Sequence, residues 1–257
     1  MIRKVFWVLI CRFTRVRCIV HLYLYHDIEN SQGLVIGGSK AMVDGAPQSL
    51  RERNRQSARD MVLDAAERLL QTGGTADFSM RALAAEAGVG FATPFNHFGS
   101  KTAIMQALSS RMIERMAARF QHEAPPGDAI ERVLAMQRIS VGLLLEQPEI
   151  SRMVVGSLGQ AGAAPSTVRP QSEAIWSLAL GACSGIAPKM VRRAQAVLPQ
   201  QLAFLFRGCV SFWIASELDD HEFLQALETG ASTLLLAFTT VGRQAYLLER
   251  IRTLGGS

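Results

Sequence analysis

The segment from residue 79 to residue 101, SMRALAAEAGVGFATPFNHFGSK, restricts the fold of this chain more than any other stretch. It begins with a serine, which caps helices because its hydroxyl accepts a hydrogen bond from an unpaired N–H of the first turn. The apolar residues that follow recur at the spacing of one buried helix face: Met80, Leu83, Ala84 and Ala87. Gly88 can adopt the left-handed conformation of a tight turn, so a short helix is expected to end there.

A second short helix is expected directly after this turn. Thr93 is placed to cap it, and Pro94 would then occupy its first position, where a missing N–H costs nothing. A third helix is expected to begin after Ser100, which is another capping residue. Two short helices joined by a tight turn form a helix-turn-helix, a DNA-binding motif whose second helix lies in the major groove.

The same residues resemble the DNA-binding domain of the TetR/AcrR family of transcriptional regulators. The resemblance extends in detail from about Arg55 to Leu108. The residues that carry it lie in a first helix, in the two helices of the motif and at the start of the next helix: Ala65-Ala66, Leu69-Leu70, Phe78-Ser79, Ala84, Ala87-Gly88-Val89, Thr93, Asn96-His97-Phe98 and Ser100-Lys101. It implies an all-α, homodimeric regulator that binds double-stranded DNA.

The resemblance also implies a division of the chain. We expect an uncertain basic and apolar extension at 1–45, which is either not translated or disordered, and a helix-turn-helix DNA-binding domain at 50–105. A helical effector-binding and dimerisation domain would follow at 106–245, and a short tail at 246–257. The implied function is that of a repressor released from a palindromic operator by a small apolar ligand.

The DNA-binding residues are predicted from their positions in this motif. Arg53 and Arg55 lie in a stretch, residues 51–59, whose net charge of +3 suits phosphates or a minor groove. The other candidates lie in the motif and just after it: Ser79, Arg81, Phe91, Ala92, Thr93, Phe95, Asn96, His97 and Lys101. Asn96 can pair with adenine or contact a phosphate, and Lys101 is placed for the phosphate backbone.

Three positions depart from the family pattern. Phe95 stands where the family usually has a tyrosine that donates its hydroxyl to a phosphate, so that contact is not expected here. Gly90 replaces a common serine, and Pro94 replaces a common aliphatic residue. His97 is expected to pack and to face a phosphate rather than to identify a base.

Apolar periodicity predicts helices along the rest of the chain. The first runs from about 57 to 71, and the helix after the motif runs from 100 to about 122, with one apolar side and with its two ends in different domains. Further helices are expected at the following ranges: 128–146, 149–157, 171–184, 189–218 with a possible break at Pro199, and 220–240. A loop is expected at 156–170, and residues from Arg243 onward would continue the last helix and then fray.

The last two long helices carry two wide apolar stripes. The first stripe consists of Leu202, Leu205, Phe206, Cys209, Val210, Trp213 and Ile214. The second consists of Leu224, Leu227, Ala231, Leu234, Leu235 and Phe238. Two such helices from each of two subunits would form a four-helix dimer interface; the alternative is that the stripes form the core of one chain.

The resemblance implies a ligand pocket among the carboxy-terminal helices, but no ligand-binding residue is assigned. Side chains of these types at helical spacing more often belong to the core than to a pocket. The apolar and aromatic candidates are Met136, Leu143, Met153, Trp176, Met190, Phe204 and Trp213. A DNA-binding regulator that responds to no ligand is the alternative.

Composition argues against other classes of protein. The four cysteines, at 11, 18, 183 and 209, form no metal-binding or disulfide pattern, and no catalytic signature is present. An acidic cluster at 217–222 is better explained as a helix start than as a metal site. We therefore expect a cytoplasmic protein that is not an enzyme and needs no cofactor or metal.

Residues 1–26 contain five cations and no acid, and they account for the whole net charge of +5. Their apolar runs are too short to span a bilayer. We favour the interpretation that residues 1–41 come from an upstream start that the cell does not use, with Met42 the natural start. A membrane-associated regulator that uses residues 1–26 as a surface helix is the alternative.

Overall fold

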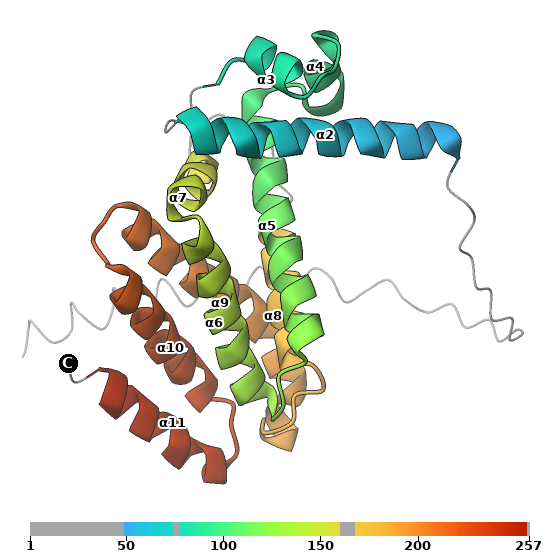
Figure 1. Ribbon diagram of the computed structural model, residues 1–257. Coiled ribbons are helices and arrows are strands. Elements are labelled where there is room, and N and C mark those ends of the chain that lie inside the picture. The colour runs from blue at the N-terminus through green and yellow to red at the C-terminus, as the bar shows by residue number, and fades with distance from the viewer. Residues whose placement is uncertain (1–48, 74–77, 160–167, 256–257) are drawn as a thin grey trace, which may run out of the picture. The chain divides into compact units, whose positions relative to one another are not determined.

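The computed structural model describes residues 49–73, 78–159 and 168–255, which form ten α-helices and two short 3₁₀ helices (Figure 1). Within these ranges the only β-pairing is an isolated bridge between Ile186 and Thr239. The all-α prediction is confirmed. The amino-terminal extension, Cys11, Cys18 and most of the predicted loop at 156–170 lie outside the described residues.

Three helices form the amino-terminal part: α2 (Leu50–Gly73), α3 (Met80–Glu86) and α4 (Ala92–Phe98). Helix α2 begins seven residues before the predicted start at 57, because Ser49 caps it by accepting a hydrogen bond from the Glu52 N–H at 3.2 Å. Its first two turns are exposed, so no apolar periodicity marks them in the sequence.

Helix α5 (Lys101–Glu123) connects two apolar cores. Ser100 caps it as predicted, accepting from the Ala103 N–H at 3.2 Å. Ile104 and Leu108 pack with the buried residues of α2 and α3, whereas Met116 and Phe120 pack in the core of the carboxy-terminal helices. Helix α5 therefore takes part in both apolar cores.

Six helices follow: α6 (Ala129–Glu146), α7 (Pro148–Gly156), α8 (Val168–Leu180), α9 (Val191–Ile214), α10 (Asp220–Leu236) and α11 (Val241–Leu254). The 3₁₀ turns η1 (Ser157–Gly159) and η2 (Pro188–Met190) precede α8 and α9. Helix α9 continues through the buried Pro199 without the break considered from the sequence. Cys183 is buried and Cys209 half-buried, both as free thiols.

Residues after 240 do not continue α10, contrary to the expectation. The chain reverses there, and α11 packs against α10 (Figure 1). Arg243 of α11 pairs with Asp128 and Glu131 at the start of α6, and Arg250 pairs with Glu228 of α10 at 2.6 Å. The sequence did not predict this packing of α11, because the ion pairs join residues that are distant in sequence and adjacent only in the fold.

The acidic cluster at 217–222 is a helix start, as expected. Asp219 accepts from the Glu222 N–H at 2.8 Å, and the Glu222 carboxylate accepts from the Asp219 N–H at 2.9 Å, which is a capping box. In the described ranges no group of three or more His, Cys, Asp or Glu side chains could hold a metal ion.

Much of the two predicted stripes is core of one chain. Leu202, Val210 and Trp213 of α9 and Leu227 and Leu235 of α10 are almost fully buried in the same subunit. Pro188–Ile214 is long and apolar enough to cross a membrane by length and composition, a test that core helices also pass. Part of this stretch, including Leu198 and Leu202, is buried inside the chain, and one such helix is weak evidence for a membrane span.

Another side of α9 remains exposed. Val197, Phe204 and Phe212 are exposed large apolar residues on this helix. Gly208 lies between the two phenylalanines in sequence, and a Cβ added to it would meet no atom within 4 Å. We call this exposed side the α9 face; none of its four residues, Val197, Phe204, Gly208 and Phe212, belongs to the predicted stripe.

Candidate nucleic-acid interface and ligand cavity

The turn between α3 and α4 has the predicted geometry. Ser79 accepts from the Ala82 N–H at 3.0 Å and caps α3. Gly88 has a φ of 65°, in the region that favours glycine. The Val89 N–H then donates to the Ala84 carbonyl at 3.0 Å, which ties the turn back onto α3.

The start of α4 differs from the prediction. The helix begins at Ala92, after Phe91, and no side chain caps it. Thr93 is therefore inside the helix, where its N–H donates to the Gly90 carbonyl at 2.8 Å, and the prediction that it caps α4 is wrong. Pro94 becomes the third residue of the helix, which is tolerated because N–H groups of the first turn have no intrahelical partner.

One side of α4 gathers several predicted DNA-binding residues. Phe91, Ala92, Phe95 and Asn96 are exposed, at the spacing of a single helix face. The Phe91 and Phe95 rings meet edge to face with centroids 5.6 Å apart, and the two residues are 59% and 42% exposed. An exposed aromatic pair has no role in the core of this chain, so it is available to a partner.

Two further candidates on α4, Thr93 and His97, are half-buried and lie beside this face. His97 packs near Phe98, with ring centroids 6.4 Å apart. His97 therefore has a packing role. The exposed face of α4 contains fewer residues than the sequence predicted to bind DNA there.

The basic candidates lie on three neighbouring elements. Arg53 and Arg55 are exposed on the first two turns of α2, and Arg81 is exposed on α3. Lys101 begins α5, with its ammonium 4.9 Å from the centroid of the Phe78 ring. Sequence reasoning did not anticipate that the Arg59 guanidinium lies 4.4 Å from the Phe98 centroid and so secures the end of α4 to α2.

Ion pairs join the acidic side of α2 to α5. Arg111 of α5 contacts Asp64 at 2.5 Å, Asp60 at 3.3 Å and Glu67 at 3.6 Å. Burial acts to lower the pKa of Arg111, but the hydrogen bond to Asp64 and the surrounding carboxylates outweigh it and raise that pKa. Asp60, Asp64 and Glu67 of α2 are thus paired with α5, while the arginines at the start of α2 stay exposed.

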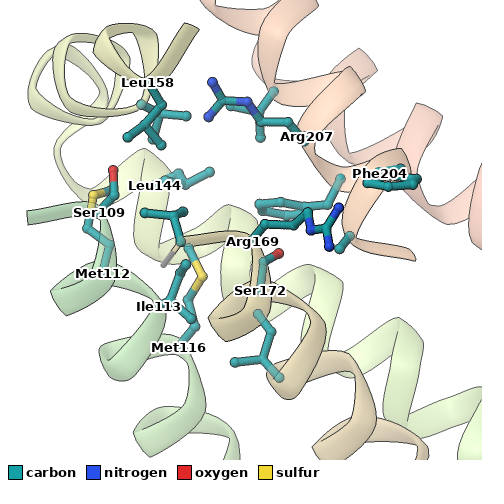
Figure 2. A pocket seen from close by; sticks show the side chains of 16 residues that line it. Ser109, Met112, Ile113, Met116, Leu144, Leu158, Arg169, Ser172, Phe204 and Arg207 are labelled. Carbon is teal, nitrogen blue, oxygen red and sulfur yellow. The ribbon is translucent and has the colours of Figure 1, made fainter. Parts of the chain in front are cut away.

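A cavity of about 320 Å³ lies among α5, α6, α7, η1, α8 and α9 (Figure 2). Its wall is mostly apolar, with Ser109, Arg169, Ser172 and Arg207 as its polar side chains. Phe204 is the one predicted ligand candidate that lines it. The other six belong to the apolar cores: Met136, Leu143, Met153, Trp176, Met190 and Trp213.

Helices α3 and α4 have the arrangement of a helix-turn-helix, and a second helical part follows them. Residues 62–108 match the family described as "Bacterial regulatory proteins, tetR family". The crystal structure of a TetR transcriptional regulator from Rhodococcus sp. RHA1 matches at a TM-score of 0.58 and 20% identity, over 71% of this chain and 97% of that chain. This likeness extends the shared fold beyond the family match.

Two other solved structures have lower TM-scores. A protein of unknown function from Rhodococcus sp. RHA1 reaches 0.46 at 23% identity, over 71% of this chain and 96% of that chain. A gamma-butyrolactone receptor, an ArpA-like protein, reaches 0.41 at 16% identity, over 79% of this chain and 98% of that chain. No curated protein matches significantly. Residues 62–108 therefore form a domain of the tetR family of bacterial regulatory proteins, in a chain that shares the fold of a TetR transcriptional regulator.

Proposed function

We propose that this protein is a homodimeric repressor that binds a palindromic operator and is released when a small molecule occupies the cavity beside α5. The observation that carries this proposal is the double role of α5. Its first turns pack against the helix-turn-helix, and Met112, Ile113 and Met116 further along it line the cavity. A ligand in the cavity would therefore press on the helix that positions the DNA-binding part.

Met112 is the side chain best placed to transmit the change. It is half-buried, lines the cavity and packs against both apolar cores. Its neighbour Arg111 forms the ion pairs to α2. Because packed interiors have little free volume, a ligand that displaces Met112 would shift α5 relative to α2 or α6.

On the DNA side, the exposed face of α4 is proposed to enter the major groove. Asn96 would pair with adenine or contact a phosphate, and Phe91 and Phe95 suit the apolar methyl group of thymine. Arg53, Arg55, Arg81 and Lys101 would bind phosphates, with Ser79 at the amino end of α3. Ala92, Thr93 and His97 would lie at or beside the groove.

The α9 face, which comprises Val197, Phe204, Gly208 and Phe212, is proposed as the centre of the dimer interface. Phenylalanines supply apolar area there, and Gly208 would allow a helix of the partner to approach closely. One DNA-binding module buries a limited area, so two modules on two half-sites supply the required selectivity. Such a regulator would act in the cytoplasm, and no enzymatic activity is assigned to it.

Selection of genomic fragments by the purified full chain tests the DNA-binding proposal. Enrichment of a palindromic site is expected. Asn96→Ala should relax the base preference, and Lys101→Ala should weaken all sites about equally. The matched control is Arg192→Ala, which removes an exposed cation of α9 outside the interface and should leave selection unchanged. A folded dimer that enriches no site would contradict the proposal.

A further inference from the structure

The ligand cavity contains a cation that no described residue neutralises. Arg207 of α9 is half-buried and lines the cavity. Its guanidinium forms no ion pair or hydrogen bond with any residue of the described ranges. Figure 2 shows it extending over the cavity from the wall opposite Ser109.

The other arginine that lines the cavity, unlike Arg207, has an acidic partner. Arg169 of α8 pairs with Glu173, one turn further on, at 3.3 Å, and its side chain is largely exposed. Burial lowers the pKa of the Arg207 guanidinium, with no acid opposing it. An arginine nevertheless stays charged at neutral pH, so the half-buried charge of Arg207 lacks a partner in the part of the chain that the structure describes.

A second polar atom of the cavity wall is also unsatisfied. Ser109 of α5 is 3% exposed, and its Oγ has no hydrogen-bond partner among the residues described. Buried polar atoms are normally paired, because an unpaired one costs free energy. Two unsatisfied polar groups on different helices, in a mostly apolar cavity, indicate that a bound molecule completes the site.

We infer that the cavity binds an amphipathic carboxylate, whose anionic group pairs with Arg207 and whose apolar body contacts the methionines and isoleucines of α5 and α8. A guanidinium presents a planar pair of donors that matches a carboxylate, which favours this anion over a simple polar group. A polar atom along the ligand could accept from or donate to Ser109. The cavity volume lies at the lower end of the roughly 300–1,000 Å³ typical of small-molecule sites, which favours a short aliphatic body.

This inference rests on the proposed function only for the claim that the ligand is an effector. Binding itself is measured by isothermal titration calorimetry on the full chain without DNA, with decanoate and decanol as probes. The two probes share one apolar body and differ in the anionic group. We expect decanoate to bind at least about tenfold more tightly than decanol, as a charged hydrogen bond allows.

Variants locate the source of this preference. Arg207→Met keeps an unbranched side chain and removes the charge, so it should abolish the preference for decanoate and spare decanol binding. Arg192→Met, at an exposed arginine of the same helix outside the cavity, is the matched control and should keep the preference. Thermal unfolding of each variant checks that the fold is intact, and retained decanol binding shows that the cavity persists.

The outcomes separate the two proposals. Equal binding of the two probes, a preference that survives Arg207→Met, or no binding of decanoate would overturn the anionic-ligand inference. Decanoate that binds through Arg207 but does not release the selected operator fragment would support the site and contradict the ligand-released repressor. An operator that is never found would contradict the proposed function alone.

Discussion

Replacement of Asp128 is expected to remove both the cap of α6 and one of the ion pairs that hold α11. One carboxylate oxygen of Asp128 accepts from the backbone N–H groups of Ile130 at 3.0 Å and Glu131 at 3.2 Å. The other oxygen accepts from Nε of Arg243, on α11, at 2.5 Å. The residue therefore joins a local helix cap to a contact 115 residues away in sequence.

The two contributions differ in size and can be separated. A helix cap contributes about 1 kcal/mol, and a hydrogen bond to a charged group contributes about 1.5–3 kcal/mol. Asp128→Ala should therefore lower the free energy of unfolding by about 3 kcal/mol. Asp128→Asn should cost about 2 kcal/mol, because asparagine caps as well as aspartate but cannot pair with Arg243.

The dependence on pH gives an independent check. Burial acts to raise the pKa of Asp128, but the hydrogen bond from Arg243 and the backbone N–H groups outweigh it, so the pKa is lowered on folding. A carboxylate with a lowered pKa stabilises the fold above its unfolded pKa of about 4, and this stabilisation is lost as the pH falls through the folded value. The difference between the wild type and Asp128→Asn should therefore be constant near neutrality and shrink in acid.

Urea unfolding followed by circular dichroism, at a series of pH values, measures both effects. Asp219→Asn is the matched control, since Asp219 also caps a helix in a capping box but forms no ion pair within the described residues. We expect that control to change the free energy of unfolding by only a few tenths of a kcal/mol. Equal costs for the two asparagine variants, or a cost of Asp128→Asn that persists in acid, would refute the reasoning.

Three further predictions concern the DNA-binding part. Gly88→Ala should destabilise the protein by about 1–2 kcal/mol, because its φ of 65° strains any residue with a Cβ; a neutral result in urea unfolding would contradict the turn. Ser79→Ala should cost about 1 kcal/mol by the same assay, with Ser79→Asp retaining the cap. Arg111→Met should lower the free energy of unfolding by about 1–3 kcal/mol, since Arg111 is a shielded partner of Asp64. Arg115→Met, at an exposed residue, should lower it by less than about 1 kcal/mol. A larger cost for Arg115→Met than for Arg111→Met would contradict the stabilising role of the Arg111 ion pairs.

Features that depend on neighbours along the chain could be predicted from the sequence. The caps at Ser79 and Ser100 and the turn at Gly88 involve hydrogen bonds or dihedral angles within three or four residues. The buried side of α5 follows from the helical repeat, because each apolar residue there must face some core. Local chemistry and periodicity therefore determined the helix-turn-helix and most helix positions.

Only the tertiary structure decided which partner each apolar or charged group meets. Periodicity shows that Leu202, Val210 and Trp213 share a face, but not that this face is buried in the same chain. Helix α11 is held in part by the contact between Arg243 and Asp128, which no local pattern encodes. The role inferred for Arg207 has the same origin. The sequence shows only an arginine, and the fold places it in a mostly apolar cavity where no described acid pairs with it.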